Sequence, residues 1–285
     1  MRRAAIYSAI LAASVIISNA ATAQTDASGV ALVVAQSSDP FSALVGKKRQ
    51  RPTARAKRIT IERYVLASDD RALLFEDRSN EARVKFLCGP DDPRFDCTID
   101  PDSPAAEIYQ IKPTRGPRGD LIYKNAEGDT MMRIASYGGA TVFWPGEARG
   151  LAASKSFGDD ASLRLGFADY ATAIRRAQAA TAYVSAATGA PIIFDLGAPP
   201  LTEHENAAVL GDAIIRAANG IKDVADDPTG ARIIASRIKR VSFSAASAPG
   251  IGFDAGVLNI RYVPGQDIDG RPSSAAVAHF LEETL

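Results

Sequence analysis

Short runs of alternating apolar and polar residues follow one another between residues 59 and 149, separated by Gly, Pro, Asp and Asn. This alternation is typical of half-buried strands, and the residues between the runs are those that tight turns prefer. The predicted strands are 59–66, 72–76, 82–87, 107–111, 120–124, 130–134 and 140–144. Strands at this spacing favour a small barrel or a sandwich, so residues 59–149 are predicted to form an all-β module.

A helical period replaces the alternation in the second half of the chain. An apolar face with 3-4-3-4-3 spacing, which places Arg175 and Arg176 on the opposite face, predicts a helix that stops at Gly189. The residues of this face are Phe167, Tyr170, Ile174, Ala177, Thr181 and Val184. A short apolar strand is predicted at 192–196.

A capping box, Thr202-Glu203-His204-Glu205, is predicted to open a second helix. Its buried stripe would be Leu210, Ile214, Ala217 and Ile221, and Asn219-Gly220 would begin its end. Alternating strands at 241–244 and 258–262 and a helix starting at Pro272-Ser273-Ser274 complete residues 150–285. The predicted fold class is α+β, with an N-terminal all-β barrel or sandwich followed by a C-terminal α+β layer whose helices cover one side of a small sheet.

The first 23 residues have the three parts of a secretory signal peptide. Arg2 and Arg3 precede an uncharged apolar run at 4–18, and Ala21-Thr22-Ala23 resembles a cleavage site. The apolar run is shorter than the roughly 20 residues of a membrane-spanning helix. We therefore expect an exported protein, most simply a periplasmic one, with no transmembrane helix after cleavage.

The charges are balanced in number but uneven in position. The chain has 33 Lys and Arg and 33 Asp and Glu, so removal of residues 1–23 would leave a formal charge of −2, which gives no case for nucleic-acid binding. Residues 24–58 are interpreted as a flexible basic tether. Its basic residues are Lys47, Lys48, Arg49, Arg51, Arg55, Lys57 and Arg58. The block is either a solvated linker or a contact for an anionic surface of lipid headgroups or glycan.

The two cysteines of the chain, Cys88 and Cys97, flank a turn-rich segment. In an oxidising compartment they are expected to form a disulfide, which would clip a hairpin between strand 82–87 and a returning strand at 95–99. Free thiols, or a metal or redox site, remain open alternatives. A thioredoxin-like motif has two residues between its cysteines, and zinc would need two further ligands.

Two stretches carry a resemblance to a known family. They are GPRGDLIYKNAEGDTMMRIASYGGATVFWP at 116–145 and GRPSSAAVAHFL at 270–281. Together they resemble a family of alphaproteobacterial exported proteins catalogued as domain of unknown function 4908. The resemblance implies a Gram-negative envelope setting and covers most of the chain after the basic block. It implies no activity and no functional residues.

No familiar catalytic or cofactor motif occurs in the sequence, and no cofactor is predicted. G-x-S-x-G, S-x-x-K, the P-loop and G-x-G-x-x-G are all missing. Arg118-Gly119-Asp120 matches an integrin-binding tripeptide but is interpreted as a turn. We expect a non-catalytic binding or accessory protein whose partner is another envelope protein or an anionic surface. The alternative is a hydrolase that uses carboxylates or His204.

Overall fold

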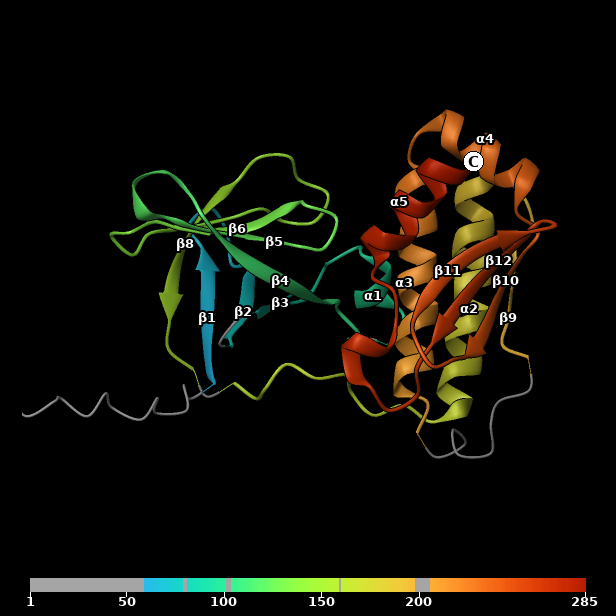
Figure 1. Cartoon of the computed structure of the whole chain (residues 1–285), viewed down its shortest axis with the longest axis horizontal. Helices are drawn as coiled ribbons and strands as arrows, with labels where there is room; N and C mark the ends of the chain where they lie inside the picture. The colour runs from blue at the N-terminus through green and yellow to red at the C-terminus, as the bar shows by residue number, and fades with distance from the viewer. Residues whose placement is uncertain (1–58, 79–80, 101–103, 159, 198–205) are drawn as a thin grey trace, which may run out of the picture. The chain divides into compact units, whose positions relative to one another are not determined.

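Eight strands between residues 60 and 156 form a closed antiparallel barrel (Figure 1). The computed structural model describes residues 59–285 except 79–80, 101–103, 159 and 198–205. Each strand pairs with its neighbour in sequence, and β8 pairs with β1 to close the barrel. The strands are β1 (Thr60–Leu66), β2 (Ala72–Asp77), β3 (Ala82–Phe86), β4 (Ile108–Arg115), β5 (Leu121–Lys124), β6 (Thr130–Ile134), β7 (Ala140–Val142) and β8 (Leu151–Ser156).

Apolar side chains fill the barrel. Leu73 and Phe75 of β2 and Val84 and Phe86 of β3 are almost completely buried, as alternation along a strand requires. Trp144, two residues after the end of β7, packs its ring against Phe86 with 4.9 Å between the centroids. The sequence left a barrel and a sandwich open, and the structure confirms a barrel with an apolar core.

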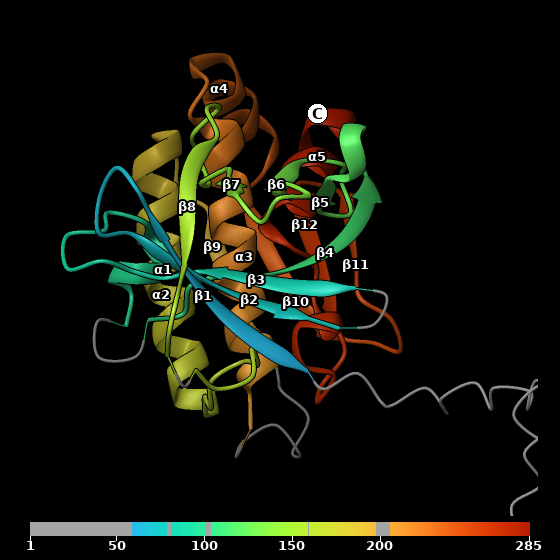
Figure 2. The same cartoon turned by 90° about the vertical axis from the view of Figure 1, so that its left-hand side faces the viewer.

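The closing strand β8 lies beyond residue 149, where the sequence analysis ended the all-β module. Residues 63–66 of β1 pair with 153–156 of β8 (Figure 2). Apart from Leu151, this strand consists of Ala, Ser and Lys; half of its residues are exposed and none is fully buried. It therefore carries little of the apolar alternation that identified the other strands, and its pairing with β1 holds it in the barrel.

The second half contains a four-stranded sheet and most of the helices. The sheet order is β11-β12-β10-β9, in which β10 runs parallel to both β9 and β12, whereas β11 and β12 form an antiparallel hairpin. The elements are α2 (Tyr170–Thr188), β9 (Ile193–Asp195), α3 (Ala208–Ala225), α4 (Pro228–Arg237), β10 (Arg240–Ala245), β11 (Gly250–Asp254), β12 (Val257–Tyr262) and α5 (Ser274–Thr284). The predicted α+β class is confirmed.

The helices of this half bury one face of the sheet. Val241 and Phe243 of β10 and Leu258 and Ile260 of β12 belong to one apolar core with the inner faces of α2, α3 and α5. The alternate residues, such as Ser244 and Arg261, are exposed. This is the one-sided arrangement that the alternation of strands 241–244 and 258–262 predicts.

Helix α2 ends at Gly189 as predicted, but its buried face differs from the prediction. Asp169 caps it by accepting a hydrogen bond from the Thr172 amide, and Gly189 ends it with a φ of 70°. Phe167 lies before the helix and Ile174 is 40% exposed. The buried face consists of Ala173, Arg176, Ala177, Ala180, Val184 and Thr188. The prediction that Arg176 faces solvent is wrong, because it pairs with Asp100 at 2.7 Å.

Helix α3 begins at Ala208, later than predicted, and it does not end at Asn219-Gly220. The capping box at 202–205 lies outside the described residues. The predicted stripe of Leu210, Ile214, Ala217 and Ile221 is buried. Helix α4, which was not predicted, follows after an Asp227 cap and Pro228 at its first turn.

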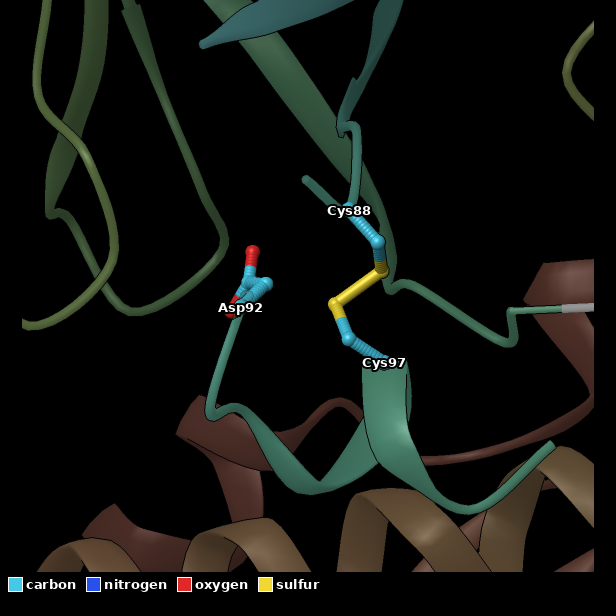
Figure 3. Close-up of side chains that lie close together, drawn as sticks. All are labelled: Cys88, Asp92 and Cys97. Atoms are coloured by element: carbon cyan, nitrogen blue, oxygen red, sulfur yellow. A yellow bond between two sulfur atoms is a disulfide. The ribbon is translucent and has the colours of Figure 1, made fainter. Parts of the chain in front are cut away.

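A short helix, α1 (Phe95–Thr98), replaces the predicted returning strand at 95–99. The disulfide between Cys88 and Cys97 is present, but it joins the end of β3 to this helix and does not clip a hairpin (Figure 3). Phe95 stacks on Tyr183 of α2 with 4.3 Å between ring centroids and belongs to the core of the second half. Helix α1 therefore packs on the helical layer, although it lies in the connection between barrel strands β3 and β4.

Removing the disulfide is expected to lower the free energy of unfolding by about 2 to 3 kcal/mol, because the crosslink restricts a short loop of the unfolded chain. Cys88→Ala/Cys97→Ala measured against wild type by urea unfolding tests this. Before that comparison, the intact mass of the unreduced protein should lie about 2 Da below that of the dithiol. Equal unfolding midpoints for the two proteins would contradict a stabilising crosslink.

Polar contacts join the barrel to the second half. Arg83 of β3 donates to Asp267 at 2.8 Å and to the Leu163 carbonyl at 2.8 Å, and Glu76 of β2 accepts from the Leu163 amide at 2.6 Å. All described residues belong to a single compact unit. Among the helices of the described part of the chain, none has the length and apolarity needed to cross a membrane.

Candidate functional site

Of the residues that the sequence singled out, those that the structure describes lie in separate parts of the fold. The basic block at 47–58 and His204 lie outside the described residues. His279 is exposed on α5, with Nδ1 3.4 Å from a carboxylate oxygen of Glu283. In Arg118-Gly119-Asp120, the Asp120 carboxylate is buried and accepts hydrogen bonds from Arg133, so its acidic group is already engaged within the protein. This agrees with the interpretation of that tripeptide as a turn.

An acidic side chain, Asp92, lies beside the disulfide between Cys88 and Cys97. One carboxylate oxygen of Asp92 lies within 4.8 Å of both sulfur atoms (Figure 3). Arg94 donates to that carboxylate at 2.7 Å. Burial alone would raise the pKa of Asp92, but the hydrogen bonds from Arg94 outweigh it and lower the pKa. Metal binding here would need two thiolates, which the disulfide does not offer.

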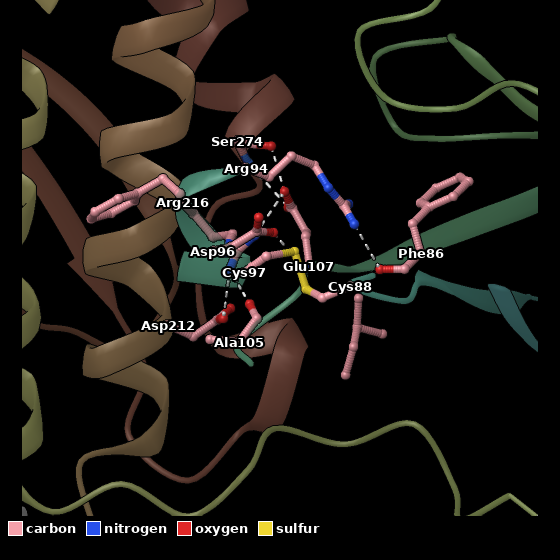
Figure 4. A network of polar contacts seen from close by, with 12 residues as sticks. Phe86, Cys88, Arg94, Asp96, Cys97, Ala105, Glu107, Asp212, Arg216 and Ser274 are labelled. Atoms are coloured by element: carbon pink, nitrogen blue, oxygen red, sulfur yellow. Dashed lines mark hydrogen bonds and ion pairs between the residues drawn. A yellow bond between two sulfur atoms is a disulfide. The ribbon is translucent and has the colours of Figure 1, made fainter. Parts of the chain in front are cut away.

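A buried network of charged side chains lies between α1, α3 and the start of β4 (Figure 4). Arg216 of α3 has no exposed surface. One guanidinium nitrogen lies 3.3 Å from Asp96 of α1 and 3.2 Å from Glu107, and the other donates to the Ala105 carbonyl at 2.6 Å and lies 3.3 Å from Asp212. A single arginine thus connects three carboxylates from three parts of the chain.

A second arginine and a serine complete this network. Arg271 donates to Asp212 at 2.5 Å and lies 3.5 Å from Glu107. The Ser274 amide donates to Glu107 at 3.1 Å, and its hydroxyl donates to the same carboxylate. Burial alone would raise the pKa of Asp212, but Arg216 and Arg271 outweigh it and lower the pKa. Asp212 therefore stays ionised, and the contacts of the network fix the start of α5 against α3 and the lead into β4.

Sequence reasoning missed this network, although one signal was present. Asp212 and Arg216 interrupt the otherwise apolar inward stripe of α3 and are spaced i, i+4. Charged residues on a buried helix face are uncommon unless they are paired. Their partners, Asp96, Glu107 and Arg271, come from distant parts of the sequence and could not have been matched to them from spacing.

A cleft lies beside the network. It consists of two adjoining cavities of about 440 Å³ and 490 Å³ that share five lining residues. The shared residues are Tyr109, Pro145, Gly146, Asp223 and Ser274. Strand β4, the loop after β7 and helices α3 and α5 thus contribute to one concave surface, which we call the Tyr109 cleft.

Two polar side chains of the Tyr109 cleft are available to a ligand. Asp223 accepts no hydrogen bond and makes no ion pair with any other described residue. Asp223 reaches solvent but lies in a concave surface, where the surrounding protein partly removes water from its carboxylate. This desolvation, together with repulsion from Glu107 and Asp226, raises the pKa of Asp223 to about 6. Burial, followed by the charge of Glu107, raises the pKa of Tyr109 well above its usual value, so its hydroxyl stays protonated. The cleft therefore offers a hydrogen-bond donor and an ionisable acceptor.

Asp223→Asn is expected to stabilise the protein slightly at pH 7.5, by less than about 1 kcal/mol because solvent screens an accessible group. A carboxyl group whose pKa is higher in the folded state favours folding while it is protonated and opposes folding as pH rises from about 4 through 6. The gain in Asp223→Asn should therefore disappear at pH 3.5. Melting temperatures at both pH values measure this, and Asp254→Asn provides an exposed control. An equal effect of Asp223→Asn at both pH values would contradict the raised pKa.

Comparison with known proteins assigns the chain to a family without giving it an activity. A family model described as "Domain of unknown function (DUF4908)" matches residues 40–281. Searches of curated proteins and of solved structures found no match to the chain.

Proposed function

The chain belongs to the DUF4908 family, and from this premise we propose that it is an exported envelope protein that binds a partner without catalysis. Residues 1–23 support export, because they have the order of a signal peptide. A disulfide suits an oxidising compartment such as the periplasm. The alphaproteobacterial origin is part of this proposal and rests on the sequence resemblance alone.

The Tyr109 cleft is the proposed binding site. The observation that carries this is the pair of cleft groups, Asp223 and the Tyr109 hydroxyl, which make no hydrogen bond to the described residues and stand on a surface fixed by the Arg216 network. Asp223, Asp226 and Glu147 line the two cavities, whereas the guanidinium of Arg94 is held by Asp92. Carboxylates beside aromatic rings favour a cationic group, such as an amine or guanidinium of the partner.

Titration with small cations tests the cleft directly. Arginine amide, lysine amide and spermidine would be added to mature protein (24–285) and followed by amide chemical shifts. We expect saturable changes around Tyr109 and Asp223 for at least one of them, weakened several-fold in Asp223→Asn and unchanged in Asp254→Asn. Shifts spread over the whole surface, or equal binding by Asp223→Asn, would remove the cleft from the proposal.

The basic tether is proposed as a second, separate contact. Lys47, Lys48, Arg49, Arg51, Arg55, Lys57 and Arg58 would attract anionic lipid headgroups or glycan. Mature protein and a deletion of 47–58 would be compared for binding to vesicles containing phosphatidylglycerol at low and high salt. Binding lost with salt and with the deletion supports the contact, whereas binding retained by the deletion argues against it.

A hydrolase is the second candidate, and the raised pKa of Asp223 beside Tyr109 favours it. A carboxyl group with a pKa of about 6 is suited to general acid or base catalysis near neutral pH. Turnover of cell-wall glycan, peptide or ester substrates that is lost in Asp223→Asn and Tyr109→Phe would establish this activity and replace the non-catalytic proposal. For the version that uses His204, His204→Ala would have to abolish the same turnover.

A further inference from the structure

At one edge of the second sheet, backbone groups have no partner among the described strands. Within the described part of the chain, strand β11 pairs with β12 alone and ends in a two-residue turn, in which Ala255 and Gly256 have φ values of 46° and 82°. In such a turn the flanking pair, Asp254 and Val257, is hydrogen-bonded, so alternate residues of β11 bond to β12. Ile251 and Phe253 therefore direct their N–H and C=O groups away from β12, toward the free edge.

Helix α5 stands beside this edge (Figure 1), and residues of both elements line a groove of about 550 Å³. Ile251 of β11 and Ala276 and Phe280 of α5 contribute apolar side chains to it, and Ala126 and Glu127 from the turn between β5 and β6 also line it. The side chain of Ile251 lies on the helix side of the sheet, so alternate side chains of any strand added at this edge would point into the groove. We call this feature the β11–α5 groove.

Two carboxylates, those of Glu127 and Glu283, line the groove together with His279, and no Lys or Arg is among the described residues that line it. His279 Nδ1 lies 3.4 Å from one carboxylate oxygen of Glu283, but the side chain of Glu283 is 69% exposed, so the carboxylate also faces solvent where a ligand can reach it. Arg261, the cross-strand partner of Gly250, packs over that glycine on the opposite face of the sheet. The groove thus combines a free strand edge, an apolar seat and carboxylates on its walls.

We propose that the β11–α5 groove binds an extended peptide segment of a partner protein, which adds a fifth strand next to β11. Main-chain hydrogen bonds to Ile251 and Phe253 supply affinity, as in other complexes in which a peptide extends a sheet. One apolar side chain occupies the seat between Ile251 and Phe280, and basic side chains two residues away on either side reach Glu127 and Glu283. This site is separate from the Tyr109 cleft and does not depend on its function.

A designed peptide tests the proposal. The probe is fluorescein-labelled Lys-Thr-Val-Thr-Lys with blocked ends, in which Lys, Val and Lys share one face of a strand. Mature protein should bind it saturably, and amide exchange at Ile251 and Phe253 should slow on binding. The analogue with Glu in place of both Lys, and the analogue methylated at alternate backbone nitrogens, should each bind at least about tenfold more weakly.

Protein variants locate the contact. Glu283→Lys should weaken binding about fivefold to tenfold, whereas Glu282→Lys makes the same charge change at an exposed position outside the groove and should leave binding unchanged. Ala276→Trp should fill the groove and abolish binding. Equal binding by Glu283→Lys and wild type, or no saturable binding of the peptide, would overturn the proposal.

Other occupants would give different results in the same experiments. A second copy paired edge to edge would double the mass in light scattering and would slow exchange at Ile251 and Phe253 without peptide, which would overturn the proposal of a partner peptide. Peptide-induced shifts centred on Asp223 would move the contact to the Tyr109 cleft and would also overturn it.

Discussion

Arg216→Met is expected to lower the free energy of unfolding by about 3 to 5 kcal/mol, the range seen when one partner of a buried ion pair is removed. Arg216 is completely buried and is within 3.3 Å of oxygen atoms of Asp96, Glu107 and Asp212. Without its guanidinium these carboxylates would repel one another in a poorly hydrated interior, although Arg271 would still contact Asp212 and Glu107. Urea unfolding at pH 7 measures the loss.

The pH dependence of this variant separates lost charge from lost packing. Arg216 is the largest of the effects that lower the pKa of Asp212 against burial. With Arg216 removed, the pKa of Asp212 in the folded state should therefore rise, so that protonation favours the folded state. Stability lost at pH 7 should then partly return as pH falls toward 5, opposite to the usual behaviour of a salt-bridged carboxylate. Arg237→Met, at the exposed end of α4, should change stability by less than about 0.5 kcal/mol at either pH. A loss below about 1 kcal/mol in Arg216→Met would mean that the network contributes little.

The network also affects the cleft. Glu107 holds Ser274, which lines the cleft, and the charge of Glu107 contributes to the raised pKa of Asp223. If the cleft binds a cation, Arg216→Met should therefore weaken binding under conditions in which the variant is still folded. That would make Arg216 a positioning residue, since it does not line the cleft itself.

Strands β1 to β7 were predictable because apolar residues alternate along them, whereas β8 carries little of this pattern. Residues 82–87 were read correctly in this way, and β3 occupies 82–86. The same reasoning failed at 95–99, where Phe95, Cys97 and Ile99 also alternate. Contacts with distant parts of the chain outweigh the local strand pattern at 95–99. Phe95 finds its partner in Tyr183 of α2, and the disulfide restrains Cys97, so that a period-two pattern is satisfied by one turn of helix.

Helix α2 illustrates a second limit of sequence reasoning. The predicted buried face included the large side chains of Tyr170 and Ile174, but the observed face contains small ones such as Ala173 and Ala180, which let α2 lie close to α3. Arg176 then falls near the contact and is buried with Asp100 as its partner. Residue size misled the prediction because close helix packing favours small side chains, whereas an exposed helix edge tolerates a single isoleucine.

The Tyr109 cleft could not have been predicted. Tyr109 reads as an ordinary strand residue and Asp223 as an ordinary helix residue, more than a hundred positions later in the sequence. Their juxtaposition depends on the docking of the barrel strand β4 against α3 and α5, which the buried network fixes. The one indication in the sequence was the pair of charged residues on the buried face of α3, Asp212 and Arg216, which signals polar partners nearby.

Gly220→Val is expected to destabilise the protein by about 3 to 5 kcal/mol, because it would overpack the contact between α3 and α5. Sequence reasoning assigned Gly220 to the end of a helix, but the helix continues to Ala225. A Cβ added at Gly220 would stand 2.5 Å from the Ser274 carbonyl oxygen and 2.7 Å from Cβ of Val277. Both distances are shorter than atoms in folded proteins tolerate, and one of the atoms belongs to the backbone of α5.

Gly220 is therefore required by the close approach of α3 and α5. In the interior of a helix, glycine is about 1 kcal/mol less favourable than alanine. In an isolated helix Gly220→Ala would stabilise; in this protein we expect even that change to destabilise, by about 1 to 3 kcal/mol. Lys222→Val on the same helix controls for the β-branched side chain and should cost less than about 1 kcal/mol. Thermal unfolding of Gly220→Val, Gly220→Ala and Lys222→Val distinguishes an effect of intrinsic helix propensity from an effect of the close approach of α3 and α5. If Gly220→Ala raised the melting temperature, the separation of α3 and α5 would be adjustable, and the start of α5, with Ser274 and Glu107, would not be held rigidly beside the cleft.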